Sequence, residues 1–214
     1  MAFQQYYVYP PTQEQSFDVY PPPQSYPDVY PPRATKQQAL FAPGTDPEII
    51  RAFRAYDEDG NGFIDDEELQ KALSTADLSY SIRTVRLLMF KYNNRNCTKI
   101  GPKEFTTLWH DLQAWRSIFE KFDRDRSGTI DNMELRDALR QLGLAVSQPV
   151  LQLLLTKYDR TGEDSGIDYD NFIECGIIVK GLTQKFKEKD KRRSGAATLT
   201  YEDFMLTVLP FIVA

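Results

Sequence analysis

The chain has 214 residues, of which 41% are hydrophobic, and a formal net charge of −5. This length suffices for one sizeable domain or for two lobes with a buried core. The acidic balance, without a basic stripe that carries interleaved aromatic residues, argues against a nucleic-acid partner.

Residues 1–43 form a segment rich in proline and tyrosine. It holds nine of the 13 prolines and six of the 12 tyrosines, and the sequence Val-Tyr-Pro-Pro occurs in it three times. Proline fixes the backbone and removes a hydrogen-bond donor, so we expect a disordered tail with polyproline II character. The tail is either a solubilising spacer or a repeated ligand whose weak sites gain from a high effective concentration.

A complete EF-hand loop follows at residues 57–68, which read DEDGNGFIDDEE. Such a loop holds calcium with side-chain oxygens at positions 1, 3, 5 and 12, a backbone carbonyl at position 7 and a water at position 9. Gly62 permits the sharp turn at position 6, Ile64 at position 8 is suited to join a paired loop, and Asp65 stands at position 9. The calcium ligands expected in this loop are Asp57, Asp59, Asn61, Phe63 and Glu68.

The second unit, residues 93–104, keeps the outline of the motif without its ligands. Ile100 and Glu104 stand at positions 8 and 12, but Arg95 occupies position 3 and Cys97 occupies position 5. A guanidinium group where a hard cation needs an oxygen ligand argues against calcium in this loop.

The third unit, residues 123–134, repeats the first unit 66 residues later and reads DRDRSGTIDNME, with Asp131 at position 9. The helix that follows it repeats too, because Leu135, Ala138 and Leu139 have the offsets of Leu69, Ala72 and Leu73, which places each trio on one helix face. The calcium ligands expected in this loop are Asp123, Asp125, Ser127, Thr129 and Glu134.

Two further units are altered. The fourth, residues 159–171, is one residue too long and ends in the amide of Asn171, although its acidic residues leave weak calcium binding open. The fifth, residues 190–203, keeps Gly195 at position 6 but has three basic residues, 191–193, in its first half. We therefore expect no calcium in the fifth loop.

The five units resemble the penta-EF-hand family over about residues 44–214. The resemblance also rests on the segments Phe105–Phe119 and Phe172–Phe186, which join neighbouring units without a break, and on a fifth loop that is two residues longer than usual. It implies an all-α fold of five EF-hands behind the disordered N-terminal tail. It also implies that the fifth hand, left without a partner in the chain, forms a homodimer or a heterodimer with a related chain.

Within this family the chain is most similar to the apoptosis-linked gene 2 subgroup, in which the first, third and fifth loops are the metal binders. The fifth loop departs from that pattern here, so calcium is assigned to the first and third loops only. The fifth unit is followed by an apolar C-terminus, which we expect to be exposed and to form the dimer interface. Its apolar residues are Leu206, Val208, Leu209, Phe211, Ile212 and Val213.

The apolar composition indicates how the calcium would be used. The chain has four Met against 13 Phe and 12 Tyr. Methionine-rich surfaces suit promiscuous binding, whereas aromatic side chains make fewer and better-shaped pockets. We therefore expect a calcium sensor or adaptor that engages selected protein targets when calcium binds. The alternatives are a passive calcium buffer and a constitutive dimeric structural partner.

We expect no enzymatic activity, because the single histidine, His110, has no recognisable nucleophile signature near it. Apolar residues spaced by three and four, from Phe105 to Phe122, are predicted to face the core.

We expect a cytoplasmic protein, since the first 30 residues contain no apolar run and residues 205–214 are too short to span a bilayer. The nucleus and the surface of a membrane are alternatives, the latter through the basic residues between Lys180 and Arg193.

Deleting residues 1–43 should leave the calcium affinity and the melting temperature of the remaining chain nearly unchanged, because a proline-rich segment buries little apolar surface. Partner recruitment or solubility should change instead. Calorimetry and thermal unfolding of the truncated and full-length proteins check this, and a melting temperature lower by several degrees would mean that the tail packs on the rest of the chain.

Overall fold

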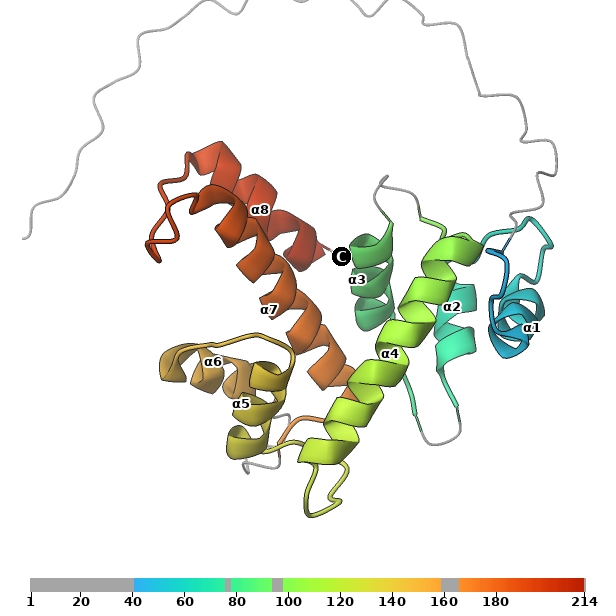
Figure 1. The fold of residues 1–214 in the computed structure, drawn as a ribbon, viewed down its shortest axis with the longest axis horizontal. Coiled ribbons are helices and arrows are strands. Elements are labelled where there is room, and N and C mark those ends of the chain that lie inside the picture. The colour runs from blue at the N-terminus through green and yellow to red at the C-terminus, as the bar shows by residue number, and fades with distance from the viewer. Residues whose placement is uncertain (1–40, 76–77, 94–97, 159–165, 214) are drawn as a thin grey trace, which may run out of the picture. The chain divides into compact units, whose positions relative to one another are not determined.

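The computed structural model describes residues 41–75, 78–93, 98–158 and 166–213. Within these ranges the chain folds into eight helices and no extended sheet, which confirms the all-α prediction (Figure 1). The helices are α1 (Pro47–Tyr56), α2 (Asp66–Leu73), α3 (Ile82–Tyr92), α4 (Pro102–Phe122), α5 (Asn132–Gln141), α6 (Gln148–Tyr158), α7 (Tyr169–Lys189) and α8 (Tyr201–Val213). The predicted disordered tail lies outside the described residues except for 41–43. None of the described helices is long and apolar enough to cross a membrane.

Five of the eight helices begin at a short polar side chain that accepts a hydrogen bond from the first turn. Asp46 caps α1, Ser81 caps α3 and Asp168 caps α7. Helices α2 and α5 begin with a reciprocal arrangement, in which Asp65 pairs with Glu68 and Asp131 pairs with Glu134. The residues at loop positions 9 and 12 therefore also determine where these two helices start.

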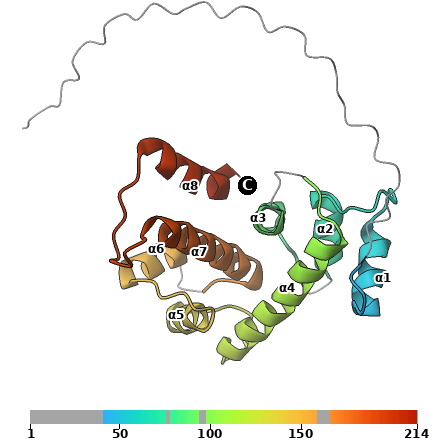
Figure 2. The ribbon, with the colours of Figure 1, turned by 45° about the horizontal axis from the view of Figure 1, so that its top comes forward.

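Two long helices each serve two neighbouring hands. Helix α4 leaves the second loop and enters the third, and α7 leaves the fourth loop and enters the fifth (Figures 1 and 2). These are the unbroken helices predicted over 105–119 and 172–186. A rigid helix between two loops links the orientation of one hand to that of the next.

The loops are joined in pairs by isolated β-bridges at position 8. Ile64 pairs with Ile100 through N···O distances of 2.9 and 2.8 Å, and Ile130 pairs with Ile167 through distances of 2.8 and 2.9 Å. Ile167 lies one residue beyond the usual position, in agreement with a fourth loop that is one residue longer. Beside this bridge, Gly166 has a φ of +77°, and a Cβ there would lie 2.6 Å from the carbonyl oxygen of Ile130.

The core is built from the helix faces that the sequence indicates. Both predicted trios on α2 and α5 are buried. The apolar face of α4 is buried from Phe105 to Phe119, and Phe122 is half-buried. Aromatic rings join the elements, since Phe105 packs edge-on against Phe53 of α1 and Phe119 packs against Phe172 of α7.

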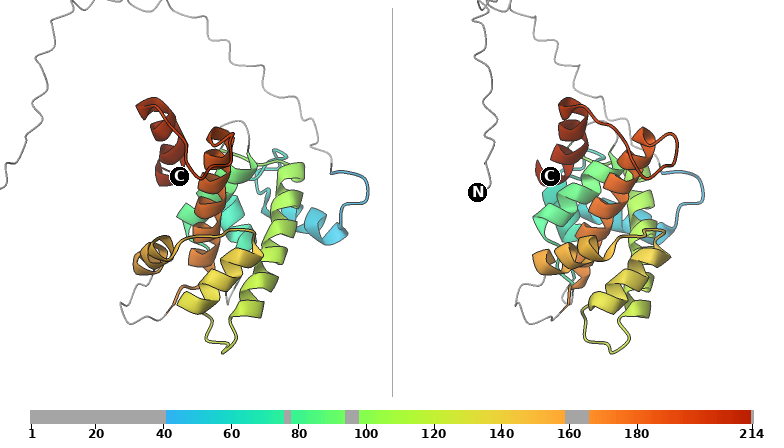
Figure 3. Two further views of the ribbon diagram at one scale, coloured as in Figure 1. Left: turned by 60° about the vertical axis from the view of Figure 1, so that its left-hand side comes forward. Right: turned by 90° about the vertical axis from the view of Figure 1, so that its left-hand side faces the viewer.

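The C-terminal helix α8 packs against α7, as Figure 3 shows, and is joined to α3 by side-chain contacts. Arg83 of α3 donates hydrogen bonds to the carbonyl oxygens of Phe211 (3.1 Å) and Ile212 (3.3 Å). The ring of Phe211 packs edge-on against Phe90 and lies over Gly181, where a Cβ would come within 2.4 Å of it. The expectation that Phe211 belongs to the exposed apolar tail is therefore wrong. Missing side-chain volume at Gly181 makes room for this ring inside the chain.

Candidate metal centres in the EF-hand loops

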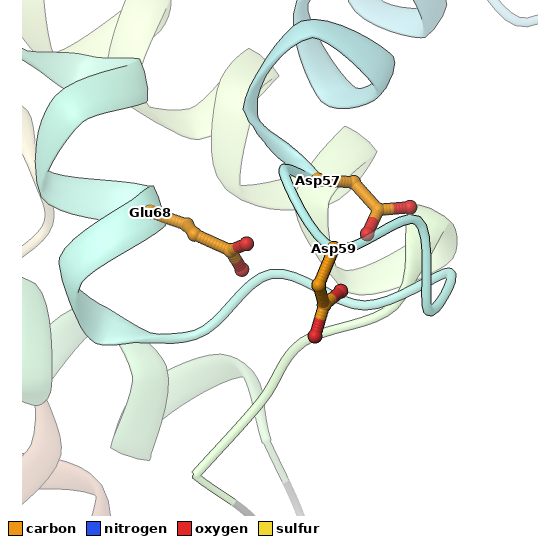
Figure 4. Close-up of side chains that lie close together, drawn as sticks. All are labelled: Asp57, Asp59 and Glu68. Carbon is orange, nitrogen blue, oxygen red and sulfur yellow. The ribbon is translucent and has the colours of Figure 1, made fainter.

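The first loop gathers three carboxylates around a common point. Oxygen atoms of Asp57, Asp59 and Glu68 all lie within 4.8 Å of one another. Glu68 extends from the first turn of α2 toward the loop that carries the two aspartates (Figure 4). Three carboxylates this close would repel one another without a cation, so the arrangement suits a hard divalent ion.

The backbone of the first loop is bent to bring these groups together. Gly60 and Gly62 have φ values of +62° and +84°, a conformation that side chains disfavour. The turn lets the N–H of Gly62 donate to Asp57 (3.0 Å) and the N–H of Asn61 donate to Asp59 (3.0 Å). The second bond keeps the pKa of Asp59 below its usual value, because it stabilises the charged carboxylate.

One buried carboxylate oxygen of this loop has no hydrogen-bond donor in the part of the chain that the structure describes, as is expected of an atom that binds a metal ion. Among the described residues, the buried Oδ1 atom of Asp57 has no hydrogen-bond partner. A buried carboxylate oxygen without a donor is unfavourable unless a cation binds it. Asp57 would then be the first ligand of the ion, with Asp59, Asn61, the carbonyl of Phe63 and Glu68 completing the set.

The third loop repeats this conformation with small differences. Gly128 donates its N–H to Asp123 (3.0 Å), as Gly62 does to Asp57. Glu134 accepts from the N–H of Arg124 at 3.0 Å, as Glu68 accepts from Glu58 at 3.1 Å.

Position 5 of the third loop is tied to its neighbours. The N–H of Ser127 donates to Asp125 at 3.0 Å, and hydrogen bonds from Ser127 lower the pKa of Asp125. The hydroxyl also donates to the carbonyl oxygen of Thr129 at 3.1 Å. Among the described residues, however, only the first loop brings three carboxylates within 4.8 Å.

In the second loop, two groups at calcium-ligand positions bond to each other. The amide of Asn93, at position 1, donates to the carbonyl oxygen of Lys99, at position 7, with a distance of 2.7 Å. In a calcium loop both of these groups would bind the ion. The unfavourable residues of this loop, Arg95 and Cys97, lie outside the described residues.

The fifth loop also keeps the bend of a metal loop. Ser194 and Gly195 donate their N–H groups to Asp190 at 2.9 and 2.8 Å. The closing residue, Asp203, forms an ion pair with Lys189 at 2.6 Å. A side-chain cation therefore neutralises the carboxylate that would close a metal site. Most of the fourth loop, residues 159–165, lies outside the described residues.

The sequence analysis missed one group at the first site. Lys99 of the second loop places its Nζ atom 3.7 Å from Asp59 and 3.8 Å from Asp65. Only the pairing of Ile64 with Ile100 brings it there. The sequence did contain a signal for this contact, because Lys99 directly precedes Ile100, the position-8 residue that pairs with Ile64 of the first loop.

Comparison with known proteins agrees with this geometry. The family model for an EF-hand domain pair matches residues 112–175, and the model for an EF-hand domain matches residues 48–79. A calcium-binding protein CBP of Oryza sativa subsp. japonica is 62% identical over 82% of this chain and 61% of its own length. The chain thus spans about three-fifths of that relative.

Other relatives extend the comparison. The probable calcium-binding protein CML48 of Arabidopsis thaliana is 43% identical over 88% of this chain and 85% of its own length. Peflin of Xenopus laevis is 36% identical over 76% of this chain and 58% of its own length. A solved structure, a homolog of programmed cell death 6 protein from Leishmania major Friedlin, superposes with a TM-score of 0.61 at 32% identity, covering 76% of this chain and 93% of that one.

Glu68→Gln and Glu134→Gln should each remove one calcium ion from the binding stoichiometry, because each change removes the carboxylate that closes a loop. The double variant should lose tight binding altogether. If the protein is a calcium sensor, we expect dissociation constants of about 10⁻⁷–10⁻⁵ M for the intact loops. Isothermal titration calorimetry measures both quantities, and more than two tight sites in the unchanged protein would contradict the assignment and implicate the fourth or fifth loop.

Proposed function

Because the chain belongs to the penta-EF-hand family of calcium-binding proteins, we propose that it is a calcium-dependent adaptor. In this proposal calcium binds through the first and third hands, and the first hand then changes the shape of a groove for protein partners. The observation that carries the proposal is that one wall of this groove belongs to α2, the helix whose first turn holds Glu68.

The groove lies between the first hand and α4 and has a volume of about 640 Å³. Its lining is mostly apolar and aromatic, with Thr75, Gln113, Arg116 and Ser117 as polar residues. Aromatic rings with a polar edge are typical of protein-binding surfaces. The apolar lining comprises Ala72, Leu73, Leu78, Tyr80, Trp109, Leu112 and Tyr169.

Helix α2 provides a direct link from the metal to the groove. Glu68 approaches the loop from the first turn of α2, and Ala72 and Leu73 of the same helix line the groove. Calcium attracts both oxygens of a closing glutamate and so shifts the helix that carries it. A shift of α2 would move Leu73 relative to Trp109 of the rigid helix α4.

Calcium should therefore increase the fluorescence of a dye that binds exposed apolar surface, and Glu68→Gln should abolish this change. Glu134→Gln is the matched control, because it removes an equivalent carboxylate from α5, which does not line the groove. Leu78→Glu should also abolish the change, whereas Leu153→Glu, on a side chain that is 69% exposed elsewhere, should not. Calcium binding by calorimetry without any dye or tryptophan response would favour a passive buffer.

A second role, constitutive dimerisation through the fifth hand, is favoured by the groups that close this loop without metal. The ion pair between Lys189 and Asp203 and the hydrogen bonds to Asp190 require no calcium. Helix α8 presents large apolar side chains to solvent even though Phe211 is buried, and such a face usually marks an interface. The exposed residues on α8 are Tyr201, Phe204, Leu206, Leu209, Ile212 and Val213.

The dimer, with itself or with a related chain, should persist in chelator and should dissociate in the double variant Leu206→Glu, Leu209→Glu, which changes two exposed side chains one turn apart on α8. Charges on this face oppose burial but leave Phe211 and its contacts with Phe90 in place. Sedimentation at micromolar concentration measures the state, with Leu153→Glu as the control. Unchanged protein that is monomeric with and without calcium would contradict the dimer.

A further inference from the structure

We propose that Lys99 of the second loop is a built-in competitor of calcium at the first loop and sets the calcium affinity of that loop. The inference rests on the proposed binding of calcium by the first hand. It assigns a role to a hand that lacks the ligands for calcium itself.

The backbone holds Lys99 at this place. It directly precedes Ile100, which exchanges two hydrogen bonds with Ile64 of the first loop at 2.8 and 2.9 Å. The amide of Asn93 holds the carbonyl oxygen of Lys99 at 2.7 Å. These contacts hold the carbonyl of Lys99 and the residue after it, so the long side chain of Lys99 is the part that can move most easily.

The side chain of Lys99 lies against two acids of the first loop that serve calcium. Its Nζ atom is 3.7 Å from the Oδ2 atom of Asp59, at position 3, and 3.8 Å from the Oδ2 atom of Asp65, at position 9. The first loop thus has a cation beside it before any calcium arrives. Other basic groups near the loop serve different partners, since Lys71 pairs with Glu58 at position 2, which is not a ligand position.

The effect of Lys99 should be moderate. Its side chain is 39% exposed, and Asp59 and Asp65 are 56% and 35% exposed, so water weakens the attraction. A divalent ion is nevertheless repelled by a positive charge at its ligands, and calcium must also displace the ammonium group from Asp59. We expect these effects together to lower the affinity of the first loop by roughly three- to tenfold.

The same geometry connects the two hands. When calcium binds, the ammonium group must leave Asp59 and Asp65 for solvent, while the backbone of Lys99 stays bridged to the first loop. The second loop thereby responds to calcium without binding it.

The test uses the full chain with Glu134→Gln, so that tight binding reports the first loop alone. In this background Lys99→Met and Lys99→Gln should both raise the calcium affinity by about three- to tenfold, measured by calorimetry. Lys99→Arg, which keeps the charge, should stay near the unchanged value. Lys103→Met, which removes an exposed charge from the first turn of α4, is the matched control and should have little effect.

A second readout is the rise in melting temperature that a fixed calcium concentration causes. It should be larger for Lys99→Met than for the parent, because tighter binding to the folded state stabilises it more. Equal affinities in the parent, Lys99→Met and Lys103→Met would overturn the role of Lys99 while leaving the first site intact. Loss of all binding in the Glu134→Gln parent would overturn the first site and the role of Lys99 together.

Discussion

The structure depends on the backbone pairing of position-8 isoleucines, because this contact joins the loops two by two. Ile64 and Ile130 are fully buried and each exchanges two hydrogen bonds with its partner, Ile100 or Ile167. Each bridge fixes the ends of four helices at once. The hydrophobic faces of those helices then meet in one core, which explains why α2 and α5 bury equivalent trios. The bridge also brings the charge of Lys99 to the acidic residues of the first loop.

The loops are of two kinds. In one kind, an oxygen at a calcium-ligand position lacks a hydrogen-bond partner within the described ranges, and in the other, groups at these positions bond to side chains of the protein. In the first loop a buried oxygen of Asp57 has no donor among the described residues, and acids at positions 1, 3 and 12 converge. In the second and fifth loops, Asn93 and Lys189 bond to the groups that a metal would otherwise hold. A loop of this kind keeps the shape of the motif, and therefore its pairing, whether or not calcium is present. The repeat can thus lose metal ligands while the fold is retained.

Spacing along the chain was enough to predict the buried faces of α2, α4 and α5, since each depends on neighbours within a few turns, whereas the all-α fold and the two shared helices were predicted from the family resemblance. Spacing also placed Asp57, Asp59 and Glu68 in one loop, and the structure brings their carboxylates together. The burial of Phe211 could not be predicted in this way. It depends on Gly181 and on Arg83, which lies 128 residues from Phe211, and periodicity identifies an apolar face without naming what covers it.

The contacts of Arg83 also indicate which parts of the chain calcium can move. Arg83 bonds to Glu174 of α7 at 2.9 Å as well as to the end of α8. Burial acts to raise the pKa of Glu174, but hydrogen bonds from Arg83 and Tyr158 outweigh it and hold the pKa below its usual value. A buried carboxylate with these partners resists separation from them, because moving it away would leave its charge in the interior without hydrogen bonds. Helices α3, α7 and α8 are therefore tied together by contacts that need no metal. Helices α2 and α5, whose first turns carry the closing glutamates, are not part of this ion-pair and hydrogen-bond cluster, so in the proposed mechanism they are the elements that calcium would move.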